Sequence, residues 1–204
     1  MGWLNEKKKV LAAARKMLAL GLVTGTAGTV SCRLPPEGKR PLLAITPSSR
    51  DYLTLDPGDI QILDFAARKV EGDLTPSVET RLHIGIYRAR QDVNAVIHTH
   101  SVFASAMAVA GISIPAILDE QAAFLGGAIK LAKYAPSGTP ELVRNAVAAL
   151  GDRNAVLLAN HGAVGVGANL PAALHACELL ENTAMIYLLA LSTGSVNELP
   201  RMAT

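Results

Sequence analysis

Two histidines separated by one residue, His98 and His100, end a short apolar run that begins at Ala95. The run has the composition of a β-strand, in which side chains alternate between the two faces. Both imidazoles should therefore project to one side, with their backbones about 7 Å apart. Two imidazoles at this spacing can converge on one metal ion, and the alternative is a hydrogen-bonded histidine pair at a strand end.

A third histidine and a carboxylate extend this possible ligand set. His161 follows the predicted buried strand 155–159, next to a glycine that gives the backbone room to turn. Glu79 follows the pair Thr75-Pro76, which is typical of a helix start, where a carboxylate is also favourable simply as a charge. Three imidazoles and one carboxylate suit a divalent cation, with Zn²⁺ the leading candidate.

The two remaining histidines are weaker candidates. His83 lies one helical turn after Glu79 and could support the site from behind. His175 lies among apolar residues of a predicted helix and is expected to be structural. The predicted ligand set leaves both of them out.

Three short clusters of glycine, serine and threonine could cradle a phosphate. They are Gly25–Thr29, Thr46–Ser49 and Thr75–Ser77. Each offers backbone N–H groups and hydroxyls, which hold phosphate in anion nests and at helix N-termini, although the same residue types also form ordinary turns and caps. The chain has no Walker A sequence and no Gly-x-Gly-x-x-Gly fingerprint, so neither nucleotide-binding motif is predicted.

The elements that must position these residues alternate along the chain. Helices are predicted over 10–18, from Thr75-Pro76 to about Arg90, from Ser101, over 140–150 and over 170–191. Strands are predicted near Val30 and over 42–45, 60–65, 95–100, 114–118 and 155–159. Because many strands are joined by hairpin-length gaps, a mixed or largely antiparallel sheet flanked by helices is favoured over a doubly wound parallel sheet.

Composition and charge limit the classes of function. The chain has 204 residues, which suits one domain over 1–204, and 19 Lys+Arg against 17 Asp+Glu give a net charge of +2. This balance argues against a nucleic-acid partner, and two cysteines are too few for a disulfide framework. Two stretches without acidic or basic residues, 93–118 and 154–177, hold too many polar groups for membrane spans. The N-terminal charges are wrong for a secretory signal, so we expect a cytoplasmic protein with no membrane partner.

Taken in order, the motifs resemble the class II aldolase and adducin family. They are Gly28-Thr29-Val30-Ser31, Ile45-Thr46-Pro47-Ser48, Pro76-Ser77-Val78-Glu79, His98-Thr99-His100-Ser101, Asn160-His161-Gly162 and the helix around Glu178–Tyr187. The resemblance covers residues 5–192. It implies a three-layer α/β/α sandwich around a mainly antiparallel sheet, assembled as a four-fold homotetramer with its sites at subunit interfaces.

The resemblance also implies roles for single residues. His98, His100 and His161 match the zinc-binding histidines, and Glu79 matches the carboxylate that binds zinc in the empty enzyme and acts as the base. The positions that match phosphate-binding residues are Gly28, Thr29, Ser48, Ser49 and Ser77. The family often has Asn in place of Thr29 and Ser in place of Val78, so this chain has fewer polar groups in its predicted phosphate cup.

The implied reaction is the cleavage of a 2-keto sugar 1-phosphate between C3 and C4, to dihydroxyacetone phosphate and an aldehyde. In this reaction Zn²⁺ is a Lewis acid that stabilises an enediolate, Glu79 transfers the proton, and no lysine is required. Some of these aldolases have a tyrosine after an Ile-Pro-Ala-Ile-like run, where this chain has Leu118-Asp119-Glu120. Asp119 or Glu120, with Glu120 favoured, could reach a neighbouring subunit's site as an acid–base group, or both could simply cap the short helix through Leu125.

Three alternatives stay open at this point. Dehydratases that act on methylthioribulose 1-phosphate share the three histidines but use another carboxylate, a role that Asp119 or Glu120 could fill. Pentulose-5-phosphate 4-epimerases have Asp at the position of Glu79, which counts against them. An adducin-like interaction domain would have lost the site, whereas the histidines and Glu79 are all present here.

Overall fold

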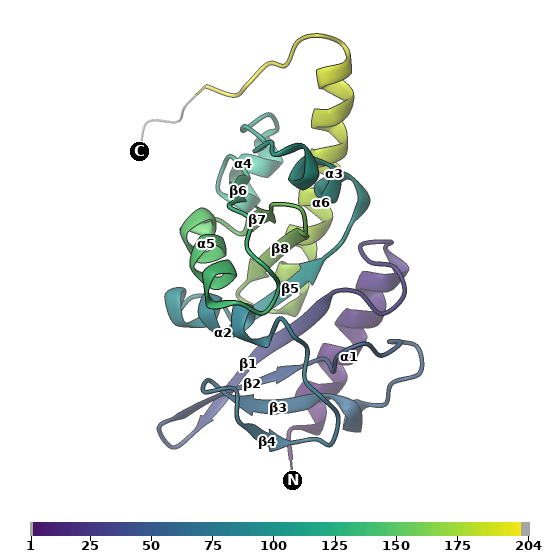
Figure 1. Ribbon diagram of the computed structural model, residues 1–204, viewed down its shortest axis with the longest axis vertical. Helices are drawn as coiled ribbons and strands as arrows, with labels where there is room; N and C mark the ends of the chain where they lie inside the picture. The colour runs from purple at the N-terminus through teal and green to yellow at the C-terminus, as the bar shows by residue number, and fades with distance from the viewer. Residues whose placement is uncertain (1, 201–204) are drawn as a thin grey trace.

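The computed structural model describes residues 2–200, and within them eight strands form one sheet in the order β4-β3-β2-β1-β5-β8-β7-β6 (Figure 1). The strands are β1 (Thr29–Glu37), β2 (Arg40–Ile45), β3 (Gln61–Asp64), β4 (Lys69–Glu71), β5 (Ala95–Thr99), β6 (Lys130–Ala132), β7 (Ala155–Leu158) and β8 (Gly162–Gly167). Neighbouring strands are antiparallel except β6 and β7, which run parallel. The mainly antiparallel sheet predicted from the sequence is confirmed.

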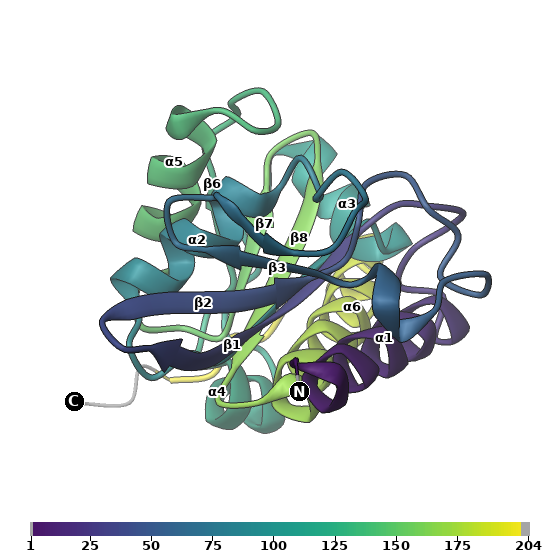
Figure 2. The ribbon, with the colours of Figure 1, turned by 90° about the horizontal axis from the view of Figure 1, so that it is seen from below.

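Helices cover both faces of this sheet, as Figure 2 shows. They are α1 (Leu4–Ala19), α2 (Thr80–Ala89), α3 (Val102–Ala110), α4 (Asp119–Leu125), α5 (Pro140–Leu150) and α6 (Leu170–Ser192), with a 3₁₀ turn at Pro57–Asp59. Buried side chains of α1, α3, α4 and α6 pack on one face, and those of α2 and α5 on the other. The three-layer α/β/α arrangement is therefore confirmed.

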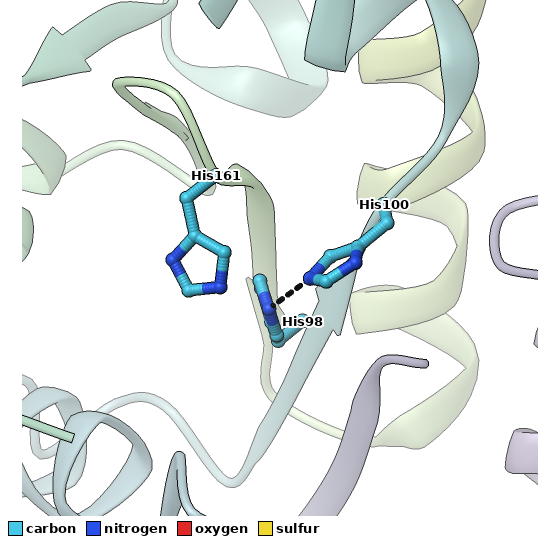
Figure 3. Close-up of side chains that lie close together, drawn as sticks. All are labelled: His98, His100 and His161. Carbon is cyan, nitrogen blue, oxygen red and sulfur yellow. Dashed lines mark hydrogen bonds between the residues drawn. The ribbon is translucent and has the colours of Figure 1, made fainter. Parts of the chain in front are cut away.

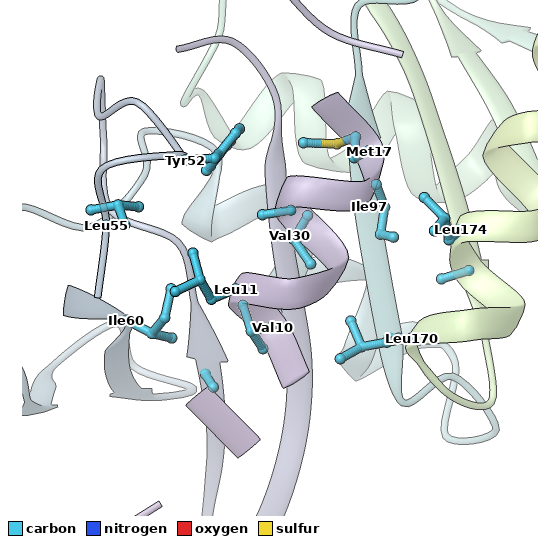
Figure 4. Packing of buried hydrophobic residues seen from close by; sticks show 14 of the residues in the cluster. Val10, Leu11, Met17, Val30, Tyr52, Leu55, Ile60, Ile97, Leu170 and Leu174 are labelled. Carbon is cyan, nitrogen blue, oxygen red and sulfur yellow. The ribbon is translucent and has the colours of Figure 1, made fainter. Parts of the chain in front are cut away.

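Helix α1 shows how the sequence pattern produces this packing. Val10, Leu11, Ala14 and Met17 recur at helical spacing and are at most 2% exposed. Figure 4 shows Val10, Leu11 and Met17 against the sheet, where Val30 contributes to the same cluster. Burying a large aliphatic side chain contributes about 1.5–3 kcal/mol, so this stripe holds α1 on the sheet.

No described helix is long and apolar enough to cross a membrane.

Several strand predictions were wrong or incomplete. The segment 114–118 is not a strand, and only Ile114 forms an isolated bridge, to Ile129. The short strands β4 and β6 were not predicted, and neither was β8, although β8 lies between β5 and β7 near the middle of the sheet. Three of the six residues of β8 are glycines, which usually weaken a strand and indicate a turn. Here a Cβ at Gly165 would lie 2.5 Å from Cys177 Sγ, so the missing side chain lets α6 pack closely on the sheet.

The predicted helix start at Thr75-Pro76 was also wrong, because α2 begins at Thr80. Pro76 forms an isolated bridge with Pro47, and the Ser77 amide donates to the Thr46 carbonyl at 3.3 Å. These long-range contacts keep the chain non-helical through this stretch. Glu79 consequently lies just before the first helical residue.

Candidate active site

The three predicted histidine ligands lie together, as Figure 3 shows. His98 is in β5, His100 follows the end of that strand, and His161 lies in the turn between β7 and β8. The Nε2 atoms of His98 and His100 are 2.9 Å apart, and the ring of His161 is centred 4.6 Å from that of His98 and 5.3 Å from that of His100. One possible ligand atom from each residue lies within 4.8 Å of the others.

Sheet pairing explains why residues so distant in sequence meet. Strand β8 pairs with β5 so that Val164 lies opposite His98 and Ala163 lies opposite Thr99. The turn before β8 therefore delivers His161 to the end of β5. Asn160 adopts a left-handed φ of 54° in this turn, a conformation that Asn tolerates better than most residues.

The electrostatics of the three imidazoles fit a divalent cation. Burial lowers the pKa of each ring, most strongly that of His98, and brings the pKa of His161 to about 4. The rings are therefore neutral near pH 7 and keep lone pairs for a metal. His98 Nδ1 lies 2.9 Å from the carbonyl oxygen of Ala163, to which it donates, and this puts the lone pair of the neutral ring on Nε2, the atom that faces His100.

Glu79 adds a carboxylate beside these rings. It is only 3% exposed, and its Oε1 lies 4.0 Å from His161 Nε2. Neither carboxylate oxygen has a hydrogen-bond partner among the described residues. Burial raises the pKa of Glu79, while the nearby Ser137 hydroxyl partly opposes the rise. A buried carboxylate without a partner is costly, and a cation held by the histidines would relieve that cost.

The predicted phosphate-binding residues share one cavity of about 180 Å³ with the histidines and Glu79. It is lined by Thr26, Ala27, Gly28, Thr29, Pro47, Ser48, Ser49, Ser77, Val78, Glu79, His98, His100, Ser137 and His161. The Thr29 and Ser77 hydroxyls are 2.6 Å apart, and the Ser48 amide donates to the Thr75 carbonyl at 2.8 Å. Among these described residues there is no lysine or arginine, so the cavity offers hydroxyl and amide groups rather than cations.

The sequence interpretation missed Ser137. Its Oγ lies 3.4 Å from His161 Nε2, and the residue lines the cavity. The signal was present in the sequence, because Ser137-Gly138-Thr139-Pro140 is a fourth cluster of glycine and hydroxyl residues before a helix. It lay outside the motifs that carried the resemblance.

Other predicted residues lie elsewhere in the chain. Asp119 and Glu120 are exposed, form the first turn of α4 and do not line this cavity. His175 packs edge-on against Phe124, with ring centroids 5.2 Å apart. His83 is a fully buried residue of α2, and its Nδ1 lies 2.7 Å from Ser31 Oγ.

Comparison with known sequences gives the same family as the sequence motifs. Residues 8–188 match the family described as Class II Aldolase and Adducin N-terminal domain. The chain is 37% identical to a 5-deoxy-D-ribulose 1-phosphate aldolase of Bacillus thuringiensis serovar kurstaki, over 96% of this chain and 90% of the relative. It is 38% identical to an L-fuculose phosphate aldolase of Escherichia coli strain K12, over 91% of this chain and 83% of the relative.

A solved structure extends the match to three dimensions. An L-fuculose 1-phosphate aldolase superimposes with a TM-score of 0.92 and 35% identity, covering 98% of this chain and 93% of the other. The family match, these relatives and the shared fold all indicate a class II aldolase. The chain belongs to the class II aldolase and adducin family, and within it to the aldehyde-lyases similar to L-fuculose-phosphate aldolase.

Proposed function

We propose that this chain is a zinc-dependent aldolase that cleaves a ketose 1-phosphate to dihydroxyacetone phosphate and an aldehyde. The substrates to consider first are L-fuculose 1-phosphate and 5-deoxy-D-ribulose 1-phosphate, the sugars named for two relatives. The observation that carries the proposal is the buried Glu79 carboxylate beside three neutral imidazoles, in a cavity that also holds a cluster of hydroxyls.

Each part of the cavity has a task in this reaction. His98, His100 and His161, with Glu79 in the absence of substrate, would hold the divalent ion. When bound, that ion supplies a Lewis acid for the ketone and its adjacent hydroxyl. The hydroxyls of Ser48, Ser49 and Ser77, with backbone N–H groups, would hold the phosphate, and Gly28 and Thr29 would complete this cup.

Glu79 would transfer the proton to and from C3 of the three-carbon fragment. As the bond between C3 and C4 breaks, the three-carbon fragment gains a proton at C3, and in the reverse direction the carboxylate removes that proton. Burial raises the pKa of Glu79 and so increases the basicity of the carboxylate, which brings it closer to the pKa that suits proton transfer near neutral pH.

A second group must exchange a proton with the oxygen of the aldehyde product. Glu79 is the one carboxylate among the described residues that line the cavity. We propose that Asp119 or Glu120 of a neighbouring subunit supplies the second group, in a homotetramer with sites at subunit interfaces. Both side chains are exposed in the single chain, as this role requires.

A product assay on the purified, metal-loaded protein tests the proposal. Release of dihydroxyacetone phosphate from either sugar phosphate is expected, together with about one equivalent of zinc by elemental analysis. Loss of water with an intact carbon chain would instead identify a dehydratase, and a protein with no transition metal and no activity would favour an interaction domain. Histidine-to-alanine changes at 98, 100 or 161 should remove the metal, whereas His175→Ala, the matched control, should keep it.

Glu79→Gln separates the base from the ligand set. The amide keeps the shape of the side chain and removes its basicity, so turnover should fall by about 10²- to 10⁴-fold while zinc stays bound. A near-normal rate with zinc bound would place the base elsewhere in the protein.

A further inference from the structure

Three alternate side chains of β1, those of Thr29, Ser31 and Arg33, bond to α2 or to the residues just before and after it. Thr29 contacts Ser77 just before the helix, and Ser31 contacts side chains within it. The guanidinium of Arg33 donates to backbone carbonyls of Tyr87 at 2.8 Å and of Arg90 and Val93 at 3.2 Å, at the end of the helix. Residues at every second position of a strand share one face, so β1 presents a polar row to this helix.

The middle contact of this row is completely buried. Ser31 Oγ lies 2.7 Å from His83 Nδ1 and 2.8 Å from the Tyr87 hydroxyl, and all three residues are 0% exposed. A buried polar group that loses its partner costs about 1–3 kcal/mol. The three side chains therefore favour one position of α2 along β1.

That position matters for the site because β1 also contacts the strand that carries the metal ligands. In the pairing of β1 with β5, Thr29 lies opposite His98 and Ser31 lies opposite Val96. On the other side, the His83 amide donates to the Glu79 carbonyl at 3.2 Å, so His83 lies one helical turn from the carboxylate. Strand β1 is thus in contact with both the first histidine ligand and the helix that begins after Glu79.

We propose that Ser31, His83 and Tyr87 are positioning residues that set the distance between the Glu79 carboxylate and the histidine cluster. This inference rests on the proposed function, because it gives the cluster a role only if Glu79 is the base. None of the three lines the cavity, so they act through the placement of α2 rather than on substrate. Glu79, the N-cap of α2, makes no side-chain hydrogen bond to the helix start, so these contacts with β1 add polar partners that the helix end does not supply itself.

Steady-state kinetics on single variants give the first test. Tyr87→Phe removes one hydroxyl, and Ser31→Ala removes the bridging atom. We expect kcat to fall about 10- to 100-fold, since a misplacement of about 1 Å can cost this much, with KM and zinc content unchanged. His83→Asn keeps a hydrogen-bonding atom near the place of Nδ1 and should restore most of the rate that His83→Leu loses.

Asp64→Asn is the matched control for a loss of stability alone. The buried Asp64 side chain also accepts hydrogen bonds, but these are partly buried and lie in the turn between β3 and β4. The Asp64→Asn substitution should lower the free energy of unfolding without lowering kcat. If Asp64→Asn lowers kcat as much as Tyr87→Phe at equal loss of stability, the cluster is merely structural and the proposal is wrong.

A double-mutant cycle with Glu79→Gln gives the decisive result. If the cluster acts through the carboxylate, Ser31→Ala should cause no further loss of kcat once that carboxylate is gone. An equal fractional loss in both backgrounds would overturn the positioning role and leave the assignment of the base intact. A full rate for Glu79→Gln alone would overturn the assignment of the base, and the positioning role with it.

Discussion

Replacing Gly162 with alanine should damage the metal site by steric contact alone. Gly162 begins β8 and directly follows His161. A Cβ there would lie 2.3 Å from the carbonyl oxygen of Thr99 and 2.9 Å from Cδ2 of His100. The first atom belongs to the backbone of β5 and the second to a proposed ligand, so neither can move without disturbing the site.

The size of the effect follows from these distances. Ordinary contacts of a Cβ begin at 3.4 Å, so β5 and β8 must separate locally by about 1 Å. Overpacking of this kind costs about 1–3 kcal/mol in the free energy of unfolding. Metal sites tolerate errors of about 0.2 Å in ligand distances, and displaced supporting groups lower metal affinity by about 10- to 100-fold. We expect both losses in Gly162→Ala.

Competition with a chromogenic chelator measures the zinc affinity, and urea unfolding measures the stability. Gly58→Ala is the matched control, because a Cβ at Gly58 has no atom within 4 Å and its φ lies outside the left-handed region. The control should keep both properties. Unchanged zinc affinity in Gly162→Ala would show that the close approach of β8 to β5 does not determine the geometry of the histidines, and would refute the reasoning.

Three further predictions concern charge and protonation. The pKa of Asp64 is lowered to about 2, because hydrogen bonds from Arg68, Arg40 and the turn amides outweigh the effect of burial. Asp64→Asn should therefore lower the free energy of unfolding by about 1–2 kcal/mol at pH 7, a modest value because both arginines are partly exposed. Urea unfolding should show that the difference between the variant and the unsubstituted protein shrinks below pH ~4. Burial lowers the pKa of His83 from 6.5 to about 3. Because the unfolded chain binds this proton more readily, the free energy of unfolding of the unsubstituted protein should fall as the pH drops through this range. In His83→Asn it should fall less steeply than in the unsubstituted protein, with a difference in slope of up to about 1.4 kcal/mol per pH unit. Asp119→Asn and Glu120→Gln, measured separately, should lower turnover with zinc retained, and full activity in both would make the pair a helix cap only.

Local patterns were sufficient to predict that His98 and His100 share one face and that α1 buries one side, whereas the three-layer arrangement was implied by the resemblance to a family. The alternation of side chains in a strand places His98 and His100 on one face, and this holds whatever surrounds the strand. The apolar spacing of α1 likewise predicts a buried stripe, which the structure has. Both predictions depend on residues that are near neighbours in the sequence.

Strand β8 could not be predicted because its glycines serve long-range contacts. A sequence of alternating valine and glycine is a weak strand signal, since glycine adds no side chain to pack. In the fold, the small residues are what allow β8 to lie between β5 and β7 with α6 against it. The features that hide this strand in the sequence are therefore the ones that bring His161 to the other two histidines.

The chemical character of Glu79 is also set by contacts that are distant in the sequence. The interpretation of Thr75-Pro76 as a helix start placed the carboxylate near exposed amides, where its pKa would be low. The bridge between Pro47 and Pro76 instead delays the helix to Thr80, and the Glu79 side chain is buried beside His161 with a raised pKa. The same motif on an exposed helix end would provide a weaker base. The position of a base can thus be found from a local motif, but its basicity depends on the strand and loop that close around it.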